Sequence, residues 1–161
     1  MSDNAINPLY GRYLEKTRPL AGYFSEQALM KYRVMMEVEY LIALSQEGKT
    51  ALRKFTPNEI KTIRNLYEKF ENADYKEIKK FESVTNHDVK AVEYFLKAKL
   101  EKTSLKDGIE WIHFAITSED TNNIAYALTL SDSLEQVLIP EIKKVVEQIN
   151  GLAKKHSDLP M

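Results

Sequence analysis

Residues 56–70 read TPNEIKTIRNLYEKF, and this stretch predicts a helix more clearly than any other in the chain. Thr56 and Glu59 have the spacing of a capping box, and Pro57 suits the first helical position because no N–H donor is needed there. Apolar side chains then recur at the spacing of one helix face: Ile60, Ile63, Tyr67 and Phe70. The stretch therefore predicts an amphipathic helix with a sharp start.

The rest of the chain repeats these helical signals. Ser25 as a cap and Gly48 as a stop predict a long helix between them. Other helices are expected from the Asp74 capping signal, from residue 86, across residues 109–116 and from residue 118. No stretch alternates polar and apolar residues as a strand would. The predicted fold class is all-α.

Both ends of the chain are expected to be unusual. Residues 1–23 are predicted to form an irregular lead because Pro8 and Pro19 break helices, and Pro140 should kink or interrupt the last helix. Beyond Pro140 an apolar stripe follows helical spacing: Ile142, Val145, Ile149, Leu152 and Ala153. No second helix follows to cover the stripe, so we expect it to pack on another subunit or on further helices of a longer protein.

Composition excludes several classes of function. The chain has 161 residues, 43% of them apolar, which fits one domain, and its 23 basic and 24 acidic residues give a net charge of −1 without a basic patch for nucleic acid. It has no cysteine, and its three histidines lack a metal-binding spacing, so no metal or disulfide is expected. No signal peptide or long apolar run is present, so no membrane partner is expected. A cytoplasmic protein fits best.

Two polar segments stand where helices are expected to begin. Residues 85–93 read TNHDVKAVE, and residues 117–123 read TSEDTNN. Free backbone N–H groups at a helix start attract anions, so two such starts could converge on one phosphate-bearing or carboxylate ligand.

The candidate residues also have simpler explanations. His87 is either a functional imidazole at a helix start or a bystander in a capping cluster of Asn86 and Asp88. Lys90 and Glu93 are either ligand contacts or a solvated ion pair. His113 lies among apolar residues and His156 near a helix C-terminus, and we expect both to be structural.

The same choice applies to two further pairs. Arg12 and Tyr13 follow Gly11 and offer a guanidinium fork and a phenol for a phosphate, although an exposed loop arginine is the common case. Thr117 and Ser118 could donate to a carboxylate or phosphate, but a helix start needs one such residue as its cap.

Taken together, the Gly11-Arg12-Tyr13 motif, the run from Thr85 to Leu96 and the run from Ile112 to Asn123 resemble the N-terminal third of the adenylosuccinate lyase family, in the fumarase/aspartase superfamily. The resemblance spans almost the whole chain. It implies an N-terminal helical domain over residues 1–115 and the start of a central long-helix bundle over residues 116–161. It also implies a homotetramer with active sites shared between subunits, and no cofactor.

The resemblance also implies an activity and roles for residues. The family releases fumarate by β-elimination from adenylosuccinate, giving AMP, and from the related carboxamide ribotide of purine synthesis. The resemblance implies substrate-binding roles for three groups of residues: Arg12 and Tyr13 at the nucleotide end, Thr117 and Ser118 at the succinyl part, and Asn86, His87 and Asp88 along the substrate. His87 would be auxiliary, because the family's general acid and base lie beyond residue 161. The fragment alone is therefore expected to be inactive.

Two alternatives remain from the sequence. The first is another fumarate-releasing enzyme, such as an argininosuccinate lyase. The second is a freestanding helical interaction module, in which residues 86–88 are only a cap and the stripe of residues 142–153 is a docking surface.

Overall fold

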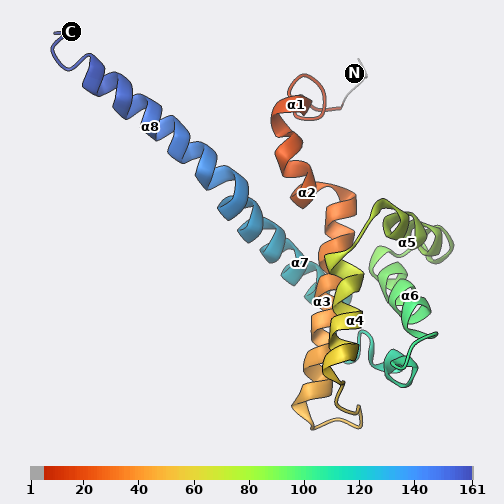
Figure 1. Cartoon of the computed structure of the whole chain (residues 1–161). Helices are drawn as coiled ribbons and strands as arrows, with labels where there is room; N and C mark the ends of the chain where they lie inside the picture. The colour runs from red at the N-terminus through yellow and green to blue at the C-terminus, as the bar shows by residue number, and fades with distance from the viewer. Residues whose placement is uncertain (1–5, 161) are drawn as a thin grey trace.

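A computed structural model describes residues 6–160, and within that range the chain forms helices and no β-strand (Figure 1). The all-α prediction is confirmed. The elements follow one another as α1 (Leu14–Thr17), η1 (Arg18–Leu20), α2 (Ala21–Phe24), α3 (Glu26–Glu47), α4 (Pro57–Glu68), α5 (Asn72–Thr85), α6 (Asp88–Leu100), η2 (Lys106–Trp111), α7 (Ser118–Ser133), η3 (Leu134–Leu138) and α8 (Ile139–Lys155).

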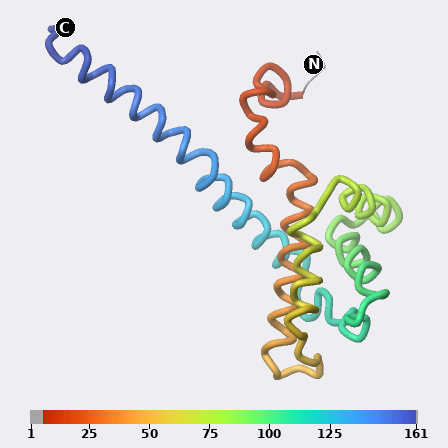
Figure 2. The backbone as a smooth tube through the Cα atoms, viewed as in Figure 1, coloured from red at the N-terminus to blue at the C-terminus, as the bar shows by residue number. Residues whose placement is uncertain are grey.

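Helix α3 is the centre of the molecule. It contacts α2, α4, α5, α6 and α7, and half of its residues are buried, on more than one face. Ser25 caps it by accepting a hydrogen bond from the Ala28 N–H at 3.1 Å, and Gly48 ends it with a left-handed φ of 70°. Both ends agree with the sequence prediction. In the tube view the chain descends along α3 and returns along α4 (Figure 2).

The capping box at the start of α4 is confirmed. The Thr56 hydroxyl accepts from the Glu59 N–H at 3.3 Å, while the Thr56 N–H donates to Glu59 at 2.8 Å. Arg53, in the loop before α4, donates to the carboxylates of both Glu59 and Asp107. This guanidinium therefore joins the start of α4 to η2.

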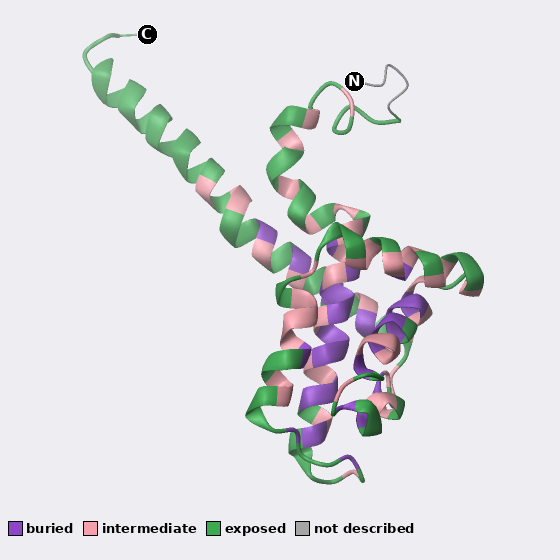
Figure 3. Ribbon diagram, turned by 45° about the vertical axis from the view of Figure 1, so that its right-hand side comes forward, coloured by how far each residue is buried: buried purple, intermediate pink, exposed green. Residues whose placement is uncertain are grey.

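The hydrophobic core lies between α3, α4, α5 and α6 (Figure 3). Its fully buried side chains include Met30 and Leu41 from α3, Ile63 from α4, Ile78 from α5 and Phe95 from α6. Helices α5 and α6 pack against each other, and α6 contributes a row of buried apolar residues: Val89, Ala91, Val92, Phe95, Leu96 and Leu100.

The predicted helix over residues 109–116 is wrong. Ile109 lies in the 3-10 element η2, and the chain then turns sharply because His113 and Ala115 adopt left-handed φ angles of 60° and 58°. Contacts with α3 hold this turn, including a 2.8 Å hydrogen bond from the Tyr40 hydroxyl to the Phe114 carbonyl. Tertiary contacts have here overridden a pattern that suits a helix.

Two smaller predictions also need correction. The lead was expected to be irregular over residues 1–23, but within its described part residues 14–24 form short helical turns. Pro19 fits there because it occupies the first turn of η1, where its missing N–H is no loss. Helix α5 is longer than expected: it begins at Asn72, with Glu71 as the cap and Asp74 as the third residue of a capping box.

Helices α7 and α8 form one continuous rod that leaves the body of the molecule (Figure 1). Between them, η3 is a π-helical segment in which the Ile139 N–H donates to the Leu134 carbonyl. Pro140 follows directly and cannot donate a backbone hydrogen bond. The irregularity expected near Pro140 takes the form of this π-helical segment before it, and the rod runs on without a break. No residue of α8 is buried, so its apolar stripe is open to solvent within the described chain (Figure 3).

The predicted domain boundary after residue 115 stays a prediction. Helix α7 packs on α3, and α8 extends away from the body of the molecule. Across residues 6–160, none of the helices combines the length and apolar character that crossing a bilayer requires.

Replacing Gly48 with alanine should destabilise the protein by about 1 kcal/mol, because its φ of 70° is unfavourable for a residue with a Cβ. Urea unfolding of the full chain would measure this loss. The control is Gly22→Ala, where the new methyl group meets no atom within 4 Å and the backbone is helical. Equal losses for both variants would contradict this assignment.

Glu59 should make folding stability depend on pH. The hydrogen bond from Arg53, followed by the Thr56 N–H, lowers the pKa of Glu59 below its usual 4.5. A carboxylate with a lowered pKa stabilises the fold above its unfolded-state pKa, and this contribution declines as the pH falls below about 4.5.

Glu59→Gln keeps the shape of the capping box without the charge. Thermal melts of the wild type and of Glu59→Gln should therefore differ most near neutral pH and converge as the pH drops towards about 2. Glu110→Gln, at an exposed position, serves as the control. A constant difference between wild type and Glu59→Gln at every pH would disprove the charge effect.

Candidate functional site

His87 is the N-cap of α6. Its Nδ1 accepts a hydrogen bond from the Lys90 N–H at 3.2 Å, and the imidazole remains 51% exposed. Because Nδ1 accepts this bond, the neutral form of the ring carries its proton on Nε2. Asn86 is not the start of this helix but the left-handed cap that ends α5, with a φ of 50°. The two residues together turn the chain from α5 into α6.

Asp88 connects this turn to α3. Its Oδ2 lies 2.7 Å from Nη2 of Arg33, and its side chain is 45% exposed. Its Oδ1 accepts from the Val89 N–H at 2.9 Å. Burial acts to raise the pKa of Asp88, but the charge of Arg33 and the Val89 N–H outweigh this effect and lower the pKa. Asp88 is therefore a fixed carboxylate at the edge of the core.

The start of α7 is built from Thr117 and Asp120. The Thr117 hydroxyl accepts from the Glu119 N–H at 3.2 Å, and the Thr117 N–H donates to Asp120 at 2.7 Å, which completes a capping box. Ser118 follows as the first helical residue and is half-buried. The capping role of Thr117 is observed, and contact of either residue with a ligand stays a prediction.

Helix α3 brings these two helix starts together. Arg33 donates to Asn122 of α7 at 2.9 Å as well as pairing with Asp88 of α6. One turn further along α3, the buried Glu37 accepts from the Thr121 hydroxyl at 2.8 Å. One side of α3 thus gathers a cluster of polar residues from distant parts of the sequence: Arg33, Glu37, Asp88, Thr121 and Asn122.

His113 joins this cluster as a largely buried, paired histidine, which agrees with the structural role expected from the sequence. Its Nδ1 lies 2.6 Å from Oε1 of Glu37, its Nε2 lies 3.9 Å from Glu93, and its side chain is 13% exposed. Glu93 in turn pairs with Lys90 at 2.7 Å. The Lys90–Glu93 pair is therefore only partly solvated, since Glu93 is buried.

One signal in the sequence could have revealed His113. Glu37 stands between Met36 and Val38 on a helix that is buried on several sides. A carboxyl group at such a position requires a polar partner. The left-handed backbone that turns His113 towards Glu37 could not be read from the sequence.

Arg12 and Tyr13 lie apart from this cluster. They precede α1, both are exposed, and the Arg12 guanidinium lies 5.4 Å from the centre of the Tyr13 ring. In Figure 1 this lead lies beyond α2, above the body of the molecule and apart from α6. The chain itself therefore brings together the motif at residues 85–96 and the motif at residues 112–123, while the Gly11-Arg12-Tyr13 motif lies apart.

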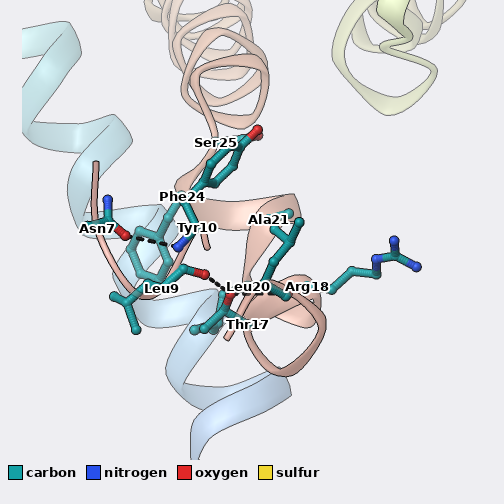
Figure 4. A pocket seen from close by; sticks show the side chains of 10 residues that line it. Asn7, Leu9, Tyr10, Thr17, Arg18, Leu20, Ala21, Phe24 and Ser25 are labelled. Carbon is teal, nitrogen blue, oxygen red and sulfur yellow. Dashed lines mark hydrogen bonds between the residues drawn. The ribbon is translucent and has the colours of Figure 1, made fainter. Parts of the chain in front are cut away.

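The lead is shaped by its own hydrogen bonds around a largely apolar pocket (Figure 4). The Tyr10 N–H donates to the Asn7 side chain at 2.9 Å, and the Thr17 hydroxyl donates to the Leu9 carbonyl at 2.9 Å. These bonds fold the segment before α1 back on itself. They hold the Gly11-Arg12-Tyr13 turn at the surface.

The surroundings of the cluster suit an anionic ligand. Two helix starts, an exposed imidazole and the Lys90 ammonium group lie on or near its surface, and these groups favour carboxylate or phosphate oxygens. Within residues 6–160, no group of three or more His, Asp or Glu side chains is arranged to hold a metal.

Known proteins share this sequence pattern. Relatives described as adenylosuccinate lyases are 44% identical in Legionella pneumophila (strain Corby), 41% in Dictyostelium discoideum and 40% in Escherichia coli (strain K12). Each alignment covers 98% of this chain and 35% of the relative, so the chain spans about a third of the length of these proteins. Residues 11–161 match the family described as Lyase. Because this match covers nearly all of the chain, the protein belongs to the Lyase family.

Proposed function

We propose that this chain is the N-terminal part of a lyase that cleaves adenylosuccinate to AMP and fumarate, and the related carboxamide ribotide in the same way. The observation that carries the proposal is the meeting of the α6 and α7 starts along α3, through Arg33 and Glu37. The names of the relatives, adenylosuccinate lyases, support this substrate class.

Helix starts suit the chemistry of this reaction. β-Elimination removes a proton next to a carboxylate and releases the purine nitrogen, so negative charge develops on the succinyl oxygens. Thr117 and Ser118, at the start of α7, are proposed to face that carboxylate. Asn86, His87 and Asp88 are proposed to line the substrate, with the Nε2–H of His87 as a donor to it.

Arg12 and Tyr13 are proposed to bind the phosphate end of the nucleotide. Their distance from the cluster fits an active site that is shared between subunits of a homotetramer, in which one chain's lead serves another chain's cluster. The exposed stripe of α8 fits the same assembly, because a row of apolar side chains favours burial against other helices. The general acid and general base are proposed to come from sequence beyond residue 161, so this segment alone should be inactive.

The proposed substrate-binding role of His87 can be tested separately from its role as the N-cap of α6. His87→Ala removes both the imidazole and the cap, and losing the cap should cost about 1 kcal/mol. His87→Asn keeps a good capping residue and removes only the imidazole. In the full-length lyase, kcat/KM for adenylosuccinate should fall roughly 10- to 100-fold in His87→Asn, while the thermal midpoint stays unchanged.

Thr56→Asn, which exchanges the cap of α4 away from the cluster, is the matched control and should keep wild-type kinetics. Wild-type kcat/KM in His87→Asn would remove the imidazole from the proposed site.

Arg12→Ala in the full-length lyase should raise KM for adenylosuccinate by roughly 10-fold or more, because a charged hydrogen bond to the phosphate is lost. Stability should change by less than about 0.5 kcal/mol, since Arg12 is exposed. Lys16→Ala removes a nearby exposed cation and should leave KM unchanged. A similar effect in both variants would point to general electrostatic attraction rather than a specific contact.

A further inference from the structure

Arg33 is a buried cation with one partner at the start of α6 and another in the second turn of α7. Its side chain is 3% exposed, within the core-facing side of α3. A guanidinium at such a position needs close partners, because removing a charge from water costs several kcal/mol. Arg33 has two: Asp88 at 2.7 Å and Asn122 at 2.9 Å.

The geometry of these bonds depends on the shape of arginine. Nη2 reaches Asp88 of α6, Nε reaches Asn122 of α7, and Nη1 faces the sulfur of Met30 at 3.7 Å. A planar fork with several donors can hold two acceptors in fixed directions, whereas a lysine ammonium on a flexible stem cannot hold them in the same way. Arg33 therefore sets the distance between the starts of α6 and α7.

Arg33 is too deeply buried to meet a ligand, but Asp88 is not. One carboxylate oxygen of Asp88 is held by Arg33, and the other lies against the Val89 N–H and 3.7 Å from Nδ1 of His87. The orientation of Asp88, and the placement of His87 beside it, thus depend on a side chain that stays in the core.

We propose that Arg33 is a positioning residue for the substrate site: through Asp88 and Asn122 it aligns the starts of α6 and α7. This inference rests on the proposed function, and it assigns a role to a residue that does not touch the substrate.

The test uses Arg33→Lys in the full-length lyase. This variant keeps the charge but loses the fork, and kcat/KM for adenylosuccinate should fall roughly 10- to 100-fold because small misplacements of binding groups slow catalysis strongly. The matched control is Arg64→Lys: Arg64 forms an equally close fork with Glu39, at 2.7 and 2.9 Å, but between α3 and α4 and away from the cluster. Arg64→Lys should keep wild-type kcat/KM.

A double-mutant cycle separates positioning from general damage. If Arg33 acts through Asp88, then Arg33→Lys should lower kcat/KM by less than about threefold when Asp88→Asn is already present. Additive losses would overturn the inference, and so would wild-type kinetics in Arg33→Lys. If Arg33→Lys does not fold, Arg33→Met is made together with Asp88→Asn and compared with Asp88→Asn alone, because removing both charges of an ion pair leaves no unpaired charge behind.

Hydrogen–deuterium exchange provides a readout that needs no substrate. In Arg33→Lys, amides in the first turns of both α6 and α7 should exchange about tenfold faster than in Arg64→Lys. Unchanged exchange at either helix start would overturn the inference. A wild-type protein that does not cleave adenylosuccinate would instead refute the proposed function, and the exchange result would still decide the role of Arg33.

Discussion

The pairing of buried charges on α3 is the constraint on which the rest of the structure depends. Arg33 and Glu37 lie one turn apart and are both removed from water, although charged groups are rarely buried without partners. Their partners come from α6, from α7 and from the turn that contains His113. Apolar packing alone would allow these three segments to slide along α3, but the directional bonds allow one arrangement. Two buried side chains of α3, Arg33 and Glu37, thus fix the positions of the other polar groups in the cluster.

This arrangement separates two tasks. The apolar side chains of α3, α4, α5 and α6 supply the hydrophobic stabilisation of the body. The Arg33–Asp88 pair, with its guanidinium buried and its carboxylate half-exposed, adds little net stability, because the cost of desolvating Arg33 offsets much of the attraction. Its contribution is geometric: it fixes which helix starts face each other. The core therefore determines whether the chain folds, and the buried charges determine how the cluster is arranged.

The sequence predicted local features well and long-range contacts poorly. The Thr56–Glu59 box and the Gly48 stop were predicted correctly because capping depends on residues a few positions apart. The left-handed conformation of His113 was missed, since it is imposed by α3 and not by neighbouring residues. The partners of Arg33 were also not foreseen, because periodicity shows which face is buried but not which distant side chain lies opposite. Within the candidate site, the sequence located the two helix starts, and the structure supplied Arg33, Glu37 and His113 between them.

The π-helical segment between α7 and α8 sets the rotational phase of the rod. Each α-helical residue advances the side-chain direction by about 100°, so the widened turn closed by the Ile139-to-Leu134 hydrogen bond shifts everything after it by roughly one residue. The buried residues of α7, such as Thr121 and Ala125, and the apolar row of α8 therefore do not lie on one continuous face of the rod. A single local widening of the helix thus decides in which direction the far half of the rod presents its apolar side.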